Sequence, residues 1–138
     1  MKITDLPFNK FIGIEVSERE GFALSLPDDK KYTNHLGTVH ASALLALAEA
    51  SSGDYLIAQL NDIGFEVVPV VRRMEAKFKK PAHGCIFSKV KVPDEKRGDF
   101  LEALRKKERA LIEIEVDVFD ASDSHAVTAT VEWFVAKR

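Results

Sequence analysis

Residues 38–60 form the segment that most limits what this chain can fold into. The segment is rich in Ala and Leu and contains no proline, so it predicts a long α-helix with Thr38 as the N-cap. Its first turns are apolar on nearly every side, which is typical of a helix that other elements cover. The rest of the chain must therefore enclose this helix.

The segments around the helix predict β-strands. Leu111–Phe119 and Ala126–Val135 alternate apolar and polar residues, and residues 120–124 predict the turn of an antiparallel hairpin between them. The other expected elements are strands at Gly13–Ser17, Phe22–Leu26, Phe65–Lys79 and Cys85–Val92 and a short charged helix at Arg97–Arg109. This order predicts an α+β fold, an antiparallel sheet wrapped around one long central hydrophobic helix.

Length and charge exclude several classes of protein. A chain of 138 residues fits one domain over residues 1–138, and a net charge of −2 lacks the basic excess of a nucleic-acid-binding protein. Cys85 is the lone cysteine, which suits a reducing cytoplasm. The first residues lack the apolar core of a signal peptide, and Glu49 and Asp54 interrupt the apolar helix. We therefore expect a cytoplasmic protein without a nucleic-acid or membrane partner.

Glu49 is the residue within the helix that most calls for an explanation. It lies among Leu47, Ala48 and Ala50, where an unpaired carboxylate costs several kcal/mol to bury. Helical spacing puts small residues on its face, and burial would raise its pKa towards that of a general base. Helix geometry alone favours the other interpretation, an ion pair with Arg72 or Arg73 of the next strand.

The start of the helix offers a second candidate. Free amides at a helix N-terminus can bind an anion or polarise a carbonyl, although Asn34 and Gly37 are also typical of a simple turn. A triad of Ser42, His40 and Glu49 is excluded, because His40 projects about 180° from Glu49 around the helix. Spacing of the histidines predicts no metal site.

A basic run follows in the next strand. Alternation puts Arg73, Lys77 and Lys79 on one face, with Glu75 among them, and Lys80 comes directly after. Such a run could hold the phosphates of a nucleotide-bearing substrate. It is more often the solvated face of a sheet.

These motifs resemble those of the hotdog-fold acyl-CoA thioesterases, in the phenylacetyl-CoA thioesterase-like branch and near a set of uncharacterised stand-alone hotdog domains. The resemblance rests on Asn34-x-x-Gly37-x-x-His40-Ala41-Ser42, continued by Leu44-x-x-Leu47-Ala48-Glu49. A second match is Phe78-Lys79-Lys80-Pro81-Ala82 followed by Gly84. The order of predicted elements extends the resemblance over nearly the whole chain.

The resemblance implies hydrolysis of a small or medium acyl-CoA by a homodimer or a dimer of dimers. Glu49 would activate water or attack the thioester, the Ala41 amide would polarise the carbonyl, and Asn34 of the partner subunit would orient the water. No cofactor or metal is implied, since coenzyme A is part of the substrate. The residues expected to contact the substrate are Gly37, His40 and Ser42, together with Arg73, Lys79 and Lys80 at the phosphates.

The chain also departs from the family pattern. His40-Ala41-Ser42 stands where the family has His-Gly-Gly, and the extra side chains narrow the approach to the backbone. The strand after the helix lacks the Ser or Thr that some members use. A non-catalytic acyl-CoA or ligand-binding hotdog domain is therefore the alternative, and a dehydratase ranks last because no Pro-Gly follows His40.

Overall fold

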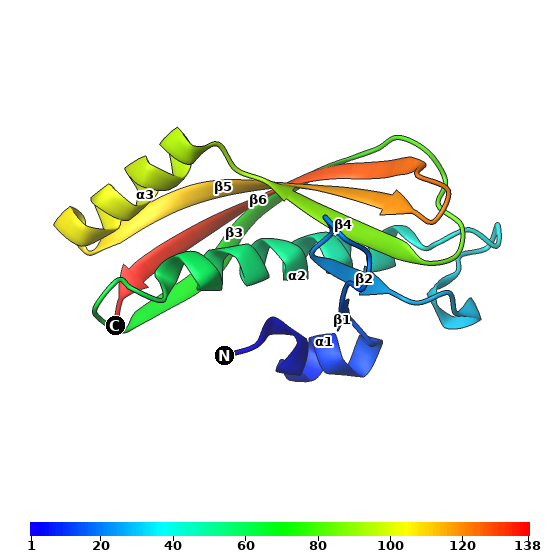
Figure 1. The fold of residues 1–138 in the computed structure, drawn as a ribbon, viewed down its shortest axis with the longest axis horizontal. Coiled ribbons are helices and arrows are strands. Elements are labelled where there is room, and N and C mark those ends of the chain that lie inside the picture. Colours follow the sequence, from blue (N-terminus) through cyan, green and yellow to red (C-terminus); the bar gives the residue numbers. More distant parts are fainter.

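A computed structural model describes residues 1–138 and shows one antiparallel sheet curved around a central helix (Figure 1). The six strands lie in the order β1-β2-β4-β5-β6-β3. Their bounds are β1 Glu15–Val16, β2 Leu24–Leu26, β3 Val67–Phe78, β4 Ile86–Lys91, β5 Arg109–Asp120 and β6 His125–Lys137. The helices are α1 Pro7–Ile12, α2 Ala41–Leu60 and α3 Asp94–Lys107, with 3-10 turns at Ile3–Asp5 and Lys30–Tyr32.

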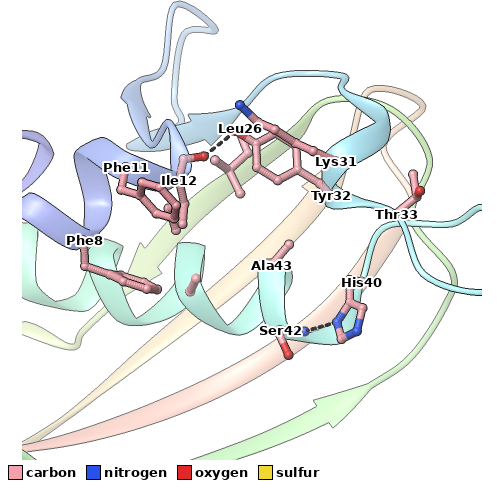
Figure 2. Close-up of a pocket in the computed structure, with 11 residues that line it drawn as sticks. Phe8, Phe11, Ile12, Leu26, Lys31, Tyr32, Thr33, His40, Ser42 and Ala43 are labelled. Atoms are coloured by element: carbon pink, nitrogen blue, oxygen red, sulfur yellow. Dashed lines mark hydrogen bonds between the residues drawn. The ribbon is translucent and has the colours of Figure 1, made fainter.

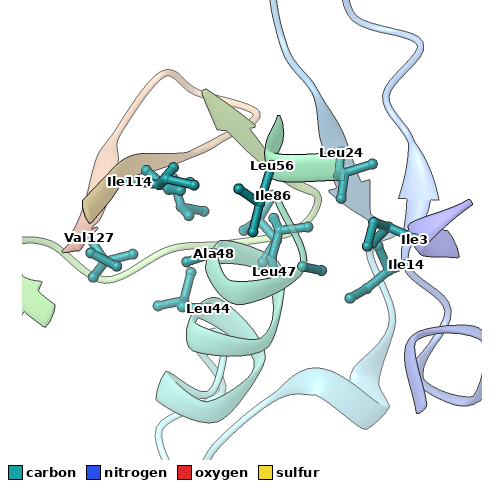
Figure 3. Packing of buried hydrophobic residues seen from close by; sticks show 14 of the residues in the cluster. Ile3, Ile14, Leu24, Leu44, Leu47, Ala48, Leu56, Ile86, Ile114 and Val127 are labelled. Atoms are coloured by element: carbon teal, nitrogen blue, oxygen red, sulfur yellow. The ribbon is translucent and has the colours of Figure 1, made fainter. Parts of the chain in front are cut away.

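The hairpin of β5 and β6 forms the centre of the sheet, as the alternation predicts. Its apolar positions face α2 and are buried, while the residues between them face outward. The core positions are Ile112, Ile114, Val116 and Val118 on β5 and Val127, Ala129, Val131 and Val135 on β6. All of these except Val131 belong to one hydrophobic cluster with Leu44, Leu47 and Leu56 of α2 (Figure 3). Burying these side chains is the main stabilising contribution.

A polar bridge fixes α2 against the sheet. The Ser51 hydroxyl oxygen lies 2.6 Å from the Leu47 carbonyl oxygen and 2.6 Å from the Ser88 hydroxyl on β4. Ser88 in turn accepts a hydrogen bond from the Leu24 amide at 3.1 Å. All four residues are buried, so these bonds satisfy groups that water cannot reach.

The helices differ from expectation in three ways. Helix α2 begins at Ala41, and its N-cap is His40 in place of Thr38, because Thr38 is held by Asn34 in the preceding turn. Helix α3 begins at Asp94, earlier than the predicted Arg97. Helix α1 was not predicted, so α2 is one of three α-helices. None of the helices is long and apolar enough to cross a membrane.

Strand β3 is an edge of the sheet with one partner, β6. A register shift between Val71 and Arg73 separates its two halves. Beyond that shift Met74 and Phe78 pair with inward-facing positions of β6, so they lie on the helix side of the sheet. They are nevertheless 39 % and 50 % exposed. Strand β3 therefore leaves both a long backbone edge and an apolar strip, Met74 and Phe78, uncovered.

Candidate functional site

The N-terminus of α2 is built by its own N-cap residue. His40 has extended backbone, with φ −63° and ψ 140°, and its Nδ1 accepts a hydrogen bond from the Ser42 amide at 2.9 Å. Nδ1 therefore carries no proton, and the neutral ring has its N–H at Nε2. Ala41 is the first helical residue, so its amide is one of those that a helix leaves without an intrahelical acceptor. The expected carbonyl-polarising donor is thus available at this end of α2.

Asn34 and Gly37 form the turn that leads into the helix. The Asn34 side chain accepts from the amides of Leu36 at 2.9 Å and Thr38 at 3.1 Å and donates to the Thr38 hydroxyl at 2.8 Å. Gly37 has φ +78°, a conformation that favours glycine. The turn role is confirmed, while the water-orienting role of Asn34 stays a prediction.

Glu49 lies two turns into α2 on the side away from the Ser51 bridge. Desolvation by burial raises the pKa of its carboxyl group above the usual value of 4.5. No side chain donates a hydrogen bond to its carboxylate, since the one side-chain bond at this residue goes from the Ser52 hydroxyl to the Glu49 backbone carbonyl. Glu49 is therefore a partly buried carboxylate with neither a counter-ion nor a donor.

The predicted ion pair of Glu49 with Arg72 or Arg73 does not form. The Arg73 guanidinium pairs with Glu75 at 2.5 Å, and the Arg72 guanidinium lies 5.7 Å from the centre of the Phe134 ring. The cause is the register of β3, which pairs Arg73 with Glu132 on the outer face of the sheet. The strand runs along β6 and does not turn its arginines towards α2.

The expected phosphate-binding cations differ in their surroundings. The side-chain hydrogen bond to Glu75, and then the charges of Glu75, Glu132 and Glu113, raise the pKa of the Arg73 guanidinium. Lys79 and Lys80 are exposed and form no salt bridge. Their segment continues to Ala82, whose carbonyl accepts from the Val39 amide at 2.9 Å. The two lysines and the N-terminus of α2 therefore belong to connected segments.

An open groove of about 640 Å³ lies between α1 and the first turns of α2 (Figure 2). Ser42, Ala43 and Ala46 of α2 line one side, and His40 lies at the helix start. The opposite side carries residues that the sequence analysis missed, namely Phe8, Phe11, Ile12, Leu26, Lys31, Tyr32 and Thr33. Pro7 at the first helical position and Gly13 just past the end were the available signals for α1.

The groove and Glu49 share one face of α2. Ser42, Ala46 and Glu49 are spaced by four and three residues, which puts them on one stripe of the helix. Ser42 and Ala46 line the groove, and Glu49 follows one turn beyond. The structure thus brings His40, Ala41 and Ser42 together, while Glu49 of the same chain lies further along the helix axis.

Comparison with known proteins identifies relatives by family and by fold. The family described as a domain of unknown function, DUF4442, matches residues 4–135. No curated protein matches the chain.

Solved structures from several bacteria share the fold. A Pseudomonas aeruginosa protein of unknown function, a probable thioesterase, is 20 % identical with a TM-score of 0.78 over 99 % of this chain and 91 % of its own. A Chlorobaculum tepidum protein of unknown function is 19 % identical with a TM-score of 0.83, covering 97 % and 88 %. A Bacillus halodurans protein solved with CoA is 20 % identical with a TM-score of 0.65, covering 88 % and 70 %. These similarities establish a hotdog-like fold, as the sequence motifs predict.

Proposed function

The chain belongs to the DUF4442 family, and we propose that it hydrolyses the thioester bond of a small or medium acyl-CoA to the free acid and CoA. Glu49 carries this proposal. It is a partly buried carboxylate without a counter-ion or a hydrogen-bond donor, on the stripe of α2 whose Ser42 and Ala46 line the groove, and burial raises its pKa. An acid kept in such a place at a cost to stability is a candidate general base or nucleophile.

The distance between Glu49 and Ala41 requires two copies of the chain. The two residues are eight positions apart on one helix, which corresponds to about 12 Å along its axis. A thioester carbonyl cannot accept from the Ala41 amide and be attacked with help from Glu49 of that same chain. In a homodimer with antiparallel α2 helices, the amide of one chain faces the carboxylate of the other. Each dimer then has two equivalent sites.

Strand β3 supplies the surface for this dimer. Its free backbone edge can pair with the same edge of a second copy, and Met74, Ala76 and Phe78 supply exposed apolar surface beside it. Pairing two β3 strands about a twofold axis would extend the sheet and bring the two α2 helices next to one another. A dimer of dimers would need a further surface of the same kind.

The proposed reaction begins with the thioester carbonyl oxygen accepting from the Ala41 amide. The Glu49 carboxylate of the second chain removes a proton from water, and the resulting hydroxide attacks the carbonyl carbon. The carbon–sulfur bond then breaks, which releases CoA thiolate and the free acid. Alternatively the carboxylate attacks the carbon directly and displaces CoA thiolate, and water then hydrolyses the resulting anhydride to the free acid and the Glu49 carboxylate. The raised pKa makes the carboxylate a stronger base in either case. Neither route calls for a metal or other cofactor.

The phosphates of CoA would meet the lysines after β3. Lys79 and Lys80 are unpaired and lie in the segment that contacts Val39, so we assign the phosphates to them. Arg73 is a weaker candidate, because nearby carboxylates already balance its charge. The neighbour from Bacillus halodurans, solved with CoA, supports a CoA ester as the substrate class.

A thiol-release assay over acyl-CoAs from acetyl to palmitoyl tests the proposal. Glu49→Gln keeps the size of the side chain and removes its charge, so we expect turnover to fall by about 100-fold or more with folding intact. Asp54→Asn is the matched control, because burial raises the pKa of this acid too, on the same helix but on another side. The control should keep wild-type turnover. Binding of acyl-CoA without turnover by the wild type would favour the non-catalytic alternative.

A mixing experiment tests the shared site. Proline is well tolerated at the first helical position, and the extended backbone of His40 is the conformation that precedes proline, so Ala41→Pro removes the amide N–H with little strain. We expect about a 100-fold loss of turnover from this variant. Co-expressed with Glu49→Gln, it should restore about a quarter of wild-type activity, because half of the dimers then contain one complete site. No restoration would contradict the two-chain site.

A further inference from the structure

The groove between α1 and α2 has firmly held walls. The Tyr32 hydroxyl donates to the carbonyl of Ile12, and the buried Asn9 side chain donates to the carbonyl of Ile3 at 3.0 Å. The Tyr32 bond holds the C-terminal end of α1, and the Asn9 bond ties the middle of the helix to the preceding 3-10 turn, where Ile3 is buried. Even so, Phe8 and Phe11 of this short helix are 63 % and 83 % exposed. Two exposed phenylalanines on an anchored helix are typical of a surface that binds an apolar ligand.

The groove begins where the proposed reaction takes place. His40 and Ser42 line it, and they are the neighbours of Ala41, whose amide would hold the thioester carbonyl. Ala43 and Ala46, further along α2, also line the groove. Figure 2 shows the ring of Phe8 beyond Ala43, on the side of the groove away from His40. A group attached to the carbonyl carbon can therefore enter the groove directly.

The chemistry of the lining separates the two parts of an acyl-CoA. Six of the eleven lining residues are apolar, and the five polar ones lie towards the His40 end of the groove, so the part next to Phe8 carries no polar side chain. The polar residues are Lys31, Tyr32, Thr33, His40 and Ser42. A pantetheine arm carries two amides that lose hydrogen bonds in such a groove. A hydrocarbon chain loses none, and each methylene gains by leaving water.

We propose that this groove binds the acyl chain, and that the substrates are apolar medium-chain acyl thioesters whose chain passes Ala46 and packs against Phe8 and Phe11. The inference rests on the proposed function for the position of the thioester. It adds the substrate class and assigns Phe8, Phe11 and Ala46 as residues that determine specificity. The small side chain of Ala46 keeps the groove open, and the two rings cover the chain.

Binding of octanoyl-CoA and acetyl-CoA, measured by calorimetry on the Glu49→Gln protein, tests this without interference from turnover. A fully buried methylene strengthens binding by about fourfold. Because the groove is open, we expect octanoyl-CoA to bind about 10- to 50-fold more tightly than acetyl-CoA. Adding Ala46→Phe should reduce this difference to about twofold and leave the affinity for acetyl-CoA unchanged.

Phe8→Ala provides a second test that does not depend on a bulky side chain being accommodated. Its ring is exposed, so the change keeps the fold, and we expect it to weaken octanoyl-CoA binding by about fivefold without affecting acetyl-CoA. Val16→Ala is the control, since Val16 is an exposed apolar residue on β1, outside the groove.

The outcomes separate this inference from the proposed function. Equal affinity for the two acyl-CoAs, or a chain-length preference that survives both Ala46→Phe and Phe8→Ala, would overturn the groove as the acyl site. Chain-dependent binding that these variants abolish, in a protein whose wild type hydrolyses no acyl-CoA, would overturn the hydrolase and leave the acyl site standing.

Discussion

Polar residues on two sides of helix α2 differ in whether their side chains have hydrogen-bond partners. On the side facing the sheet, Ser51 is buried and bonded to Leu47 and Ser88. Two residues earlier and about 200° around the helix, Glu49 has no partner for its carboxylate. The first side contains polar groups that hold the fold together. The second keeps a group whose burial costs stability, and such local inconsistency is expected at a functional site.

The largest effect on stability is expected when the acid is moved to the side of α2 that faces the sheet. Ser51→Glu would bury a carboxylate against β4 without a counter-ion, and we expect it to lower the free energy of unfolding by at least about 3 kcal/mol or to prevent folding. Urea denaturation measures the loss. Glu49→Ser, the reverse change, should leave the fold at least as stable as the wild type. Equal effects of the two substitutions would remove the distinction between the two sides.

A smaller loss of stability is expected when the Ser51 hydroxyl on the sheet-facing side is removed. Ser51→Ala leaves the Ser88 hydroxyl with one buried partner fewer, so we expect a loss of about 1–3 kcal/mol in the free energy of unfolding. The double variant with Ser88→Ala should lose less than the sum of the two single variants, because both hydroxyls of the bridge are then gone. Additive losses would show that Ser51 and Ser88 contribute to stability independently, without coupling α2 to β4.

The smallest expected effect is the pH dependence of stability. The pKa of Glu49 is raised by burial, so the folded state favours the protonated form, and stability falls as pH rises from 4.5 through the folded-state pKa. Glu49→Gln should flatten this fall in melting temperature. Burial alone would also raise the pKa of Asp120, but the amides of His83, Ser124 and Ser122 lower it. Its contribution is lost instead as pH falls below the usual value of 3.8, and Glu49→Gln should not alter that loss.

Sequence periodicity predicted the parts of the fold that repeat over many residues. The alternation of β5 and β6 and the apolar composition of α2 extend over a dozen residues or more, so they identified the central hairpin and its helix. Helix α1 spans six residues and has no period to detect. Because α1 forms one wall of the groove, the proposed acyl site could not be predicted either.

The candidate site was predicted residue by residue but not as a geometry. Glu49 follows from its place among apolar residues of the predicted helix, and the amide of Ala41 follows from the family resemblance. The partner of Glu49 depended on the register of β3, and a single irregularity next to Arg72 decides which side of the sheet its arginines face. Local sequence does not encode such a pairing, because it is determined by β6, far along the chain.

The pairing of β3 also has a consequence for synthesis. Its one partner in the chain is β6, so during translation residues 67–78 stay without a hydrogen-bonded neighbour until residue 125 and those after it have been made. In that interval an apolar edge is open to any nascent chain nearby. The charges on this strand and directly after it oppose the docking of unfolded apolar segments on the edge; they are carried by Arg72, Arg73, Lys77, Lys79 and Lys80. We expect the basic run to reduce aggregation of the nascent chain, in addition to any role in binding a ligand.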